Sequence, residues 1–340
     1  MSNIDNLSIV IRYIRTKSIK NLRLVSKKIN TYVTSDIKFC FKVKKTNENQ
    51  WSFGIHDCNP NAFPKYIIGL KFSDSFKEYI NMSLIPRNIT RITFGRRFNQ
   101  SVDNLPNNIT HLTFGDKFDQ SVNKLPNSIT HLTFGDDFDQ PVNNLPKNIT
   151  HLTFGIAFCH SVDKLPKKIT HLTFYGDFNE SVDRLPNSII CLKFSDGFNK
   201  PVNNLPNRIT HLTFGHCFNQ SVDNLPNSIT HLTFGNDFNK PVDKLPTNLT
   251  HLVFCDVFNK TVNKLPNKVT HITFGWNFNK SIDKLPNSVT HLTFSSIYKL
   301  RSTDKLPNKL KSLKYNDSMA INSAMQIMMQ NIMTQNLIMQ

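Results

Sequence analysis

The chain has 340 residues, a formal net charge of +17 and a hydrophobic fraction of 39%. Its 27 Phe exclude a disordered chain, and no run approaches the length of about 18 apolar residues that a transmembrane helix needs. Basic residues through the first twenty positions argue against a secretory signal peptide. The six Cys form no C-x-x-C pair, which favours reduced thiols. We therefore expect an intracellular protein, in the cytoplasm.

Residues 1–45 are predicted to form a small α-helical head. They hold 11 Lys and Arg against 2 Asp and Glu, so 11 − 2 gives a net +9. Apolar residues recur at spacings of three and four, as on one face of a helix: Ile19, Leu22, Val25 and Ile29, with Leu24 beside them. Residues 46–62, with Trp51 and Phe53, are predicted to be a connector that packs on the first coil of the next region.

An internal repeat determines the architecture of residues 63–315. From Arg91 to Thr290 the chain consists of ten copies of a twenty-residue unit, L-P-x-x-I-T-H-L-T-F-G-x-x-F-N-x-x-V-[D/N]-x, and less regular copies flank them. Of the 27 Phe, 23 occupy the two Phe positions of the unit. Such a repeat indicates an array of stacked units.

One unit predicts one short strand and an extended return path. Leu112 and Phe114 alternate with His111 and Thr113, so His-Leu-Thr-Phe should form a strand with one buried face. Because one unit cannot bury this face alone, units must stack at about 4.8 Å per strand. We predict a mostly β fold, a leucine-rich-repeat-like parallel β-solenoid. A propeller is the alternative, but its blades need about 40–50 residues each.

The motif L-P-x-x-I-T-H-L-T-F-G-x-x-F-N resembles the FNIP repeat of social amoebae and giant viruses over residues 62–315. It is also similar to the twenty-residue leucine-rich repeats of bacterial effectors. The FNIP resemblance implies protein–protein interaction and no known catalysis.

The segment from Ser18 to Asn30 resembles the second half of an F-box, although the usual opening Leu-Pro and acidic helix start are missing. That resemblance implies docking to the Skp-family linker of a cullin ubiquitin ligase, through Ile19, Leu22, Leu24, Val25 and Ile29. The alternative is a plain helical cap on the first coil, which solenoids need. Residues 316–340, rich in Met and Gln, are predicted to be a C-terminal cap helix or a partner-seeking amphipathic helix.

Nine His share one repeat position: His111, His131, His151, His171, His211, His231, His251, His271 and His291. Stacked one per strand, they form a line, whereas zinc needs three or four ligands that converge on one point. We expect a His–Thr ladder on the outer face of the strands, with pKa values lowered by mutual repulsion. No catalytic triad spacing, phosphate-binding loop or dinucleotide motif stands out, so the sequence predicts no enzyme, no cofactor and no small-molecule substrate.

One pair of positions varies between otherwise constant units. It precedes the second Phe and follows the strand, at the edge of the expected concave face. We name these pairs the variable rim, and the residues proposed there for partner binding are Arg96, Arg97, Asp116, Lys117, Asp136, Asp137, His216, Asp237, Trp276 and Asn277. The alternative is that these turn residues are under no selection, so that their variation carries no information about a partner.

Three functions are compatible with these patterns. The first is a substrate adaptor of a cullin ligase, with the head on the linker and the repeats on the target. The second is a stand-alone repeat scaffold or host-interaction decoy. The third, a nucleic-acid-associated basic protein, is disfavoured because acidic residues such as Asp136 and Asp137 lie in the middle of the array.

Overall fold

The computed structural model describes residues 42–47, 50–54, 68–76, 80, 82, 85, 87–295, 297–301 and 304–316. Residues 1–41 of the predicted head and residues 317–340 of the predicted tail lie outside this part. The described residues contain strands and turns and no α-helix, so the expected helical head finds no support. They include no helix that could cross a membrane.

The chain divides into two compact units, Met1–Phe138 and Asp139–Gln340. The first unit begins with an antiparallel pair, β1 (Lys42–Asn47) and β2 (Gln50–Gly54). The predicted helical head extended to residue 45, but residues 42–45 belong to strand β1, so the prediction is wrong for these residues. Val43 stands between Lys42 and Lys44, an alternation of apolar and polar residues that fits a strand.

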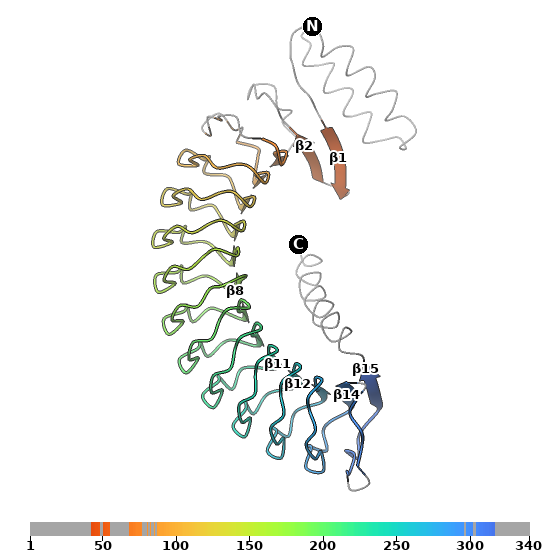
Figure 1. Cartoon of the computed structure of the whole chain (residues 1–340). Helices are drawn as coiled ribbons and strands as arrows, with labels where there is room; N and C mark the ends of the chain where they lie inside the picture. The colour runs from red at the N-terminus through yellow and green to blue at the C-terminus, as the bar shows by residue number, and fades with distance from the viewer. Residues whose placement is uncertain are drawn as a thin grey trace, which may run out of the picture. The chain divides into compact units, whose positions relative to one another are not determined.

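A parallel ladder in chain order follows in the first unit (Figure 1). Its strands are β3 (Gly69–Lys71), β4 (Arg91–Thr93), β5 (His111–Thr113) and β6 (His131–Thr133). Each strand pairs with the next in register, so that His111 lies opposite His131.

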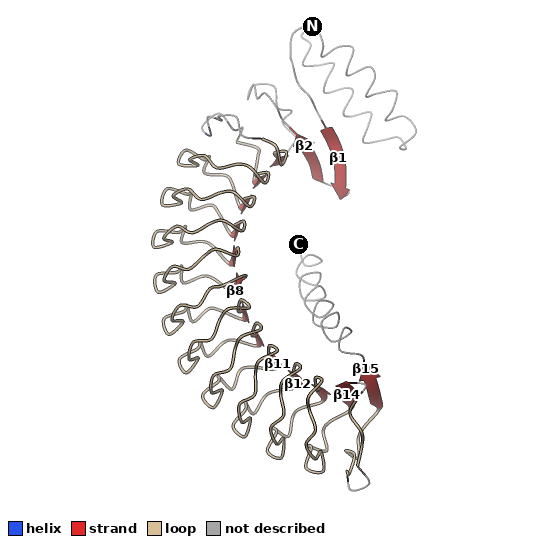
Figure 2. Cartoon of the chain, in the orientation of Figure 1, coloured by secondary structure: helices blue, strands red, loops and turns tan. Residues whose placement is uncertain are grey.

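The second unit continues the same pattern with nine short strands, separated by turns and extended chain (Figure 2). Neighbours are parallel and again in register, as His211 opposite His231. The strands are β7 (His151–Phe154), β8 (His171–Phe174), β9 (Cys191–Lys193), β10 (His211–Thr213), β11 (His231–Thr233), β12 (His251–Val253), β13 (His271–Thr273), β14 (His291–Ser295) and β15 (Ser312–Asn316). The predicted parallel β-solenoid is confirmed in both units.

The core consists of columns of identical side chains. Leu172, Phe174 and Phe178 are buried, and the two Phe rings lie 3.9 Å apart. Phe174 also stacks on Phe154 of the preceding coil at 5.4 Å and on Phe194 of the next at 6.3 Å. Each coil thus completes the apolar surface of its neighbours, which explains why a strict twenty-residue period is kept.

Ring spacings show that the second unit curves with its strands on the concave side. The His rings that precede the strand's Leu lie 4.2 to 4.3 Å apart from coil to coil. Phe254 and Phe274 are 5.5 Å apart, and Phe258 and Phe278, farther from the sheet, are 6.1 Å apart. The distance between neighbouring coils therefore increases away from the strands. The sheet must then lie on the inner side of the curve, as Figure 1 shows for this unit.

A ladder of Asn side chains joins the turns after the second Phe. The Asn219 backbone amide donates to Asn199 Oδ1 at 2.9 Å, and Asn239 donates in the same way to Asn219 at 3.1 Å. Asn259 and Asn279 continue the series at 3.0 Å each. This ladder gives the Asn of the Phe-Asn motif its role, because it satisfies backbone donors that the strands do not reach.

The Gly of the repeat is explained by close approach of coils rather than by backbone conformation. A Cβ at Gly215 would lie 1.9 Å from the carbonyl oxygen of Ser195 in the preceding coil. Among the described residues only Gly176 has a positive φ, at 66°. Tyr175, Ser195 and Cys255 stand at the same repeat position in other coils, and none of them has a positive φ.

Candidate protein-binding rim

The variable rim of the second unit is a hydrogen-bonded edge. The Cys217 amide donates to the Asp196 carbonyl at 2.8 Å, Asp237 donates to His216 at 2.9 Å, and Asn277 donates to Asp256 at 2.8 Å. Because the backbone of each rim segment is tied to the preceding coil, the rim side chains stand at fixed intervals. Such an edge can present a preorganised binding surface.

The rim residues of the first unit are charged and pair with one another. Arg96 Nε lies 2.7 Å from Asp116 Oδ2, and Lys117 Nζ lies 2.6 Å from Asp137 Oδ2 in the following coil. Arg97 is exposed, and Asp136 is partly exposed. These ion pairs are exposed, so each contributes only about 0–1 kcal/mol to stability.

The rim of the second unit is different, because it exposes large apolar side chains. Ile156 and Ile297 are each 48% exposed, and Val257 and Trp276 are each 37% exposed. Of the residues predicted there from sequence, Trp276 and its neighbour Asn277 are exposed, and His216 Nε2 lies 3.5 Å from Asp237 Oδ1. The sequence prediction omitted Ile156, Val257 and Ile297, although an apolar residue at a polar repeat position was the available signal.

Four carboxylates lie among these apolar residues, at Asp177, Asp196, Asp237 and Asp256. The same rim contains no Lys or Arg. Burial and then the charges of Asp237, Asp196 and Asp177 raise the pKa of the Cys217 thiol. The carboxylates of three coils therefore act on one point of the rim.

The His row lies on the strands and is half-buried, not on a freely exposed outer face as predicted. His251 Nδ1 lies 2.9 Å from Thr250 Oγ1, whose hydroxyl is 3.0 Å from the Thr230 carbonyl oxygen. Since that hydroxyl donates to the carbonyl, the imidazole donates from Nδ1 to Thr250. The same Thr–His contact recurs in other coils, so the predicted His–Thr ladder is present.

Burial lowers the pKa of His171, His231 and His251 to about 4, and neighbouring His add to the effect. Mutual repulsion, the expected cause, therefore comes second to burial. These three His are therefore neutral at pH 7 and offer no positive charge to a phosphate. Within the part of the chain that the structure describes, no three His, Cys, Asp or Glu side chains are placed to hold a metal ion.

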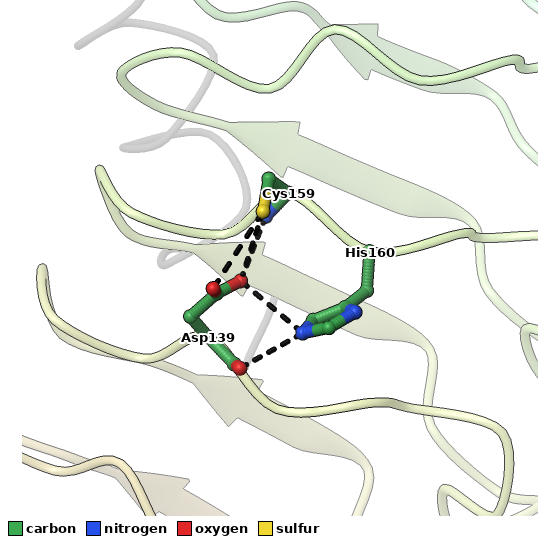
Figure 3. A network of polar contacts seen from close by, with 3 residues as sticks. All are labelled: Asp139, Cys159 and His160. Carbon is green, nitrogen blue, oxygen red and sulfur yellow. Dashed lines mark hydrogen bonds and ion pairs between the residues drawn. The ribbon is translucent and has the colours of Figure 1, made fainter.

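One cluster has the residue types of a cysteine nucleophile site (Figure 3). Cys159 Sγ donates to Asp139 Oδ1 at 3.3 Å, and His160 Nε2 lies 2.8 Å from the Asp139 carbonyl oxygen and 3.3 Å from Oδ1. The hydrogen bond to Asp139 is the main reason why the pKa of the Cys159 thiol is raised. A catalytic Cys needs a lowered pKa and an adjacent base. Here the carboxylate binds both groups and keeps the thiol protonated.

The predicted docking face of the head, formed by Ile19, Leu22, Leu24, Val25 and Ile29, lies outside the described residues. The same holds for its predicted contact with a Skp-family linker.

Comparison with known proteins agrees with this geometry. The chain is similar to CroV588, whose crystal structure is that of a novel circular LRR protein, with a TM-score of 0.65 and 38% identity over 74% of this chain and 44% of that chain. It thus spans less than half the length of CroV588. YopM from Yersinia enterocolitica WA-314 aligns over 75% of this chain and 65% of its own, at 17% identity and a TM-score of 0.39, too low for an argument. No curated protein matches.

The FNIP Repeat family matches the chain over most of the array. The matched segments are 83–117, 98–124, 121–157, 161–197, 181–217, 198–237, 218–256, 238–275 and 261–297. The resemblance read from the repeated L-P-x-x-I-T-H-L-T-F-G motif is confirmed, and with it an LRR-like solenoid of the type typical of protein-interaction scaffolds. The chain belongs to the FNIP repeat family.

Proposed function

We propose that this chain is a non-catalytic scaffold that binds another protein through the variable rim of its second unit. One observation supports this most strongly. Among the residues that the structure describes, nine large apolar side chains are exposed, and four of them lie on this rim, at Ile156, Val257, Trp276 and Ile297. Tyr175, also exposed, directly precedes a rim pair. Val257, Trp276 and Ile297 lie in three successive coils, and Ile156 and Tyr175 lie in two successive coils farther along the same edge. Exposed apolar residues near one another mark interaction sites.

The chemistry of the described residues supports binding rather than catalysis. Burial raises the pKa of Cys191 to about 11 and that of Cys255 to about 12, so neither thiol is activated. Cys159 and Cys217 are shifted in the same direction. None of these four Cys forms a disulfide, which supports the proposal that the protein works inside cells.

Rim variants test this function. Replacing Ile156, Val257 and Trp276 with Ser should abolish capture of proteins from amoeba lysate, or weaken it at least about tenfold, because Trp and large apolar residues dominate interface energies. The fold should be retained, since none of the three side chains belongs to the buried core, and the melting temperature should fall only by a few degrees. Captured proteins and melting are measured by quantitative mass spectrometry and calorimetry.

A matched control changes three exposed apolar residues away from the rim, Leu300, Leu306 and Tyr315, to Ser. This variant should retain capture. If both triple variants capture the same proteins as the wild type, the rim is not the binding surface. Equal loss in both variants would indicate nonspecific hydrophobic capture.

We further propose that the head connects the scaffold to a cullin ligase, as the F-box-like segment Leu22-Arg23-Leu24-Val25-Ser26-Lys27 suggests. Replacing Leu22 and Val25 with Asp in the full chain should abolish binding to a purified Skp-family linker, because Asp cannot occupy an apolar docking face. The matched control, Asn21→Asp with Ser26→Asp, adds the same charge at polar positions and should retain binding. Binding is measured by calorimetry.

If the wild-type chain does not bind the linker, the head is only a cap. The chain is then a stand-alone scaffold or a host-interaction decoy. That result would not contradict the proposal that the rim binds protein, because the rim variants are tested with captured proteins and not with the linker.

A further inference from the structure

The exposed apolar residues of the second-unit rim indicate where a partner docks, and the charges between them indicate which kind. Asp177 and Asp196 are exposed, and Asp237 and Asp256 are partly exposed. Within the described residues, none of the four carboxylates forms an ion pair with Lys or Arg. The first-unit rim, by contrast, balances its Asp residues with Arg96 and Lys117.

Two of these carboxylates make contacts with a backbone amide and an imidazole. Asp196 Oδ1 accepts the His216 backbone amide at 3.3 Å, and Asp237 Oδ1 lies 3.5 Å from His216 Nε2. Burial lowers the pKa of Lys193, and the charge of Asp196 acts in the opposite direction. The Lys193 Nζ lies over the Tyr175 ring, 4.5 Å from its centroid. The rim therefore combines exposed apolar side chains with net negative charge.

We infer that the partner presents a basic segment of a protein, with Lys or Arg side chains on the rim carboxylates and apolar side chains on Ile156, Val257 and Trp276. Charge complementarity selects this occupant, since an acidic segment or a nucleic acid would be repelled. This inference rests on the proposed function and specifies the chemistry of its partner.

The spacing along the rim sets the length of the bound segment. Asp177 and Asp256 are four coils apart, which at about 4.8 Å per coil is about 20 Å. An extended chain advances about 3.3 Å per residue, so about six residues span this distance. Ile156 lies one coil before Asp177, and Val257 and Trp276 lie at and beyond the coil of Asp256. The bound segment would therefore carry its basic residues in the middle and its apolar residues toward the two ends.

The test uses a displayed library of random twelve-residue peptides, selected on the immobilised full chain. We expect enriched peptides to carry several Lys or Arg together with aromatic or aliphatic residues. Replacing Asp177, Asp196, Asp237 and Asp256 with Asn should weaken these peptides at least about tenfold, and increasing the salt concentration should weaken them in the wild type. Fluorescence anisotropy of labelled peptides measures both effects.

The matched control replaces four acids of the turns before the repeated Leu-Pro, Asp163, Asp183, Asp223 and Asp243, with Asn. This changes the net charge by the same amount, and several coils already have Asn at that position, for example Asn143 and Asn203. Affinity should stay within about twofold of the wild type. Equal weakening in both quadruple variants would overturn the inference, because only net charge would matter.

Two further outcomes separate this inference from the proposed function. If enriched peptides are acidic or neutral and the Ile156, Val257 and Trp276 triple variant loses them, the rim binds protein but the predicted partner chemistry is wrong. If no peptide is enriched, or if peptides survive both the triple and the rim Asp→Asn variants, both proposals fail.

Discussion

Replacing Phe174 with Ala should lower the free energy of unfolding by about 3–5 kcal/mol, the cost of a large-to-small change in a packed core. Phe174 is fully buried, and its ring packs on Phe154, Phe178 and Phe194. The cavity would therefore remove contacts in three successive coils. Denaturant unfolding measures the loss, and Tyr175→Ala next to it, on a 38% exposed side chain, is the control that should cost much less.

The damage should also remain local, because coils contact only their neighbours. Hydrogen exchange should lose protection in β7, β8 and β9 first and leave β13 and β14 protected. Uniform loss of protection along the second unit would contradict a stack of nearly independent coils.

Acidification should destabilise the protein through the half-buried His of the strands. The pKa of His171, His231 and His251 is lowered to about 4, and the pKa values of His211 and His271 are also lowered, in each case mainly by burial. The unfolded chain, with His pKa values near 6.5, then binds more protons than the folded chain. Stability is therefore complete above about pH 6.5 and falls as the pH drops toward 4.

A variant with these five His changed to Gln provides the comparison. Several small losses act together, so the wild-type melting temperature should fall between pH 7.5 and pH 4.5 by on the order of 10 °C more than that of the variant. Gln can still donate to the neighbouring Thr but does not titrate. Identical pH profiles for the two proteins would show that the His are not held in a half-buried row.

The repeat made most of the fold predictable. Leu172 and Phe174 alternate with His171 and Thr173, so the apolar side chains lie on one face of the strand. A twenty-residue unit can bury that face only by stacking on other units. Strand position, parallel order, the two Phe columns and the FNIP family followed from this one pattern. The secondary structure of residues 1–45 was harder to predict, because this segment occurs once and has no repeat to guide the reading. Lys42–Asn47, at its end, forms β1 and pairs with β2.

The rim was predictable in position but not in composition. Variation at Trp276 and Asn277 identified the place, whereas the degree to which Ile156 and Val257 are exposed depends on how neighbouring coils cover them. Likewise, the sequence predicted lowered His pKa values but assigned them to repulsion. How deeply His171 and His231 sit between neighbouring strands is a property of the packed stack, so burial as the main cause needed coordinates.

Photo-crosslinking can show whether the rim of the second unit is the surface that binds the partner. A benzoylphenylalanine placed at Asn277 on the rim, or at Lys284 in the turn of the same coil before Leu285-Pro286, is irradiated with the library-selected peptides bound. Both positions are exposed, so neither substitution should disturb the fold. We expect crosslinks from position 277 and none above background from position 284. Crosslinks from 284 alone, or equal yields from both, would contradict this expectation.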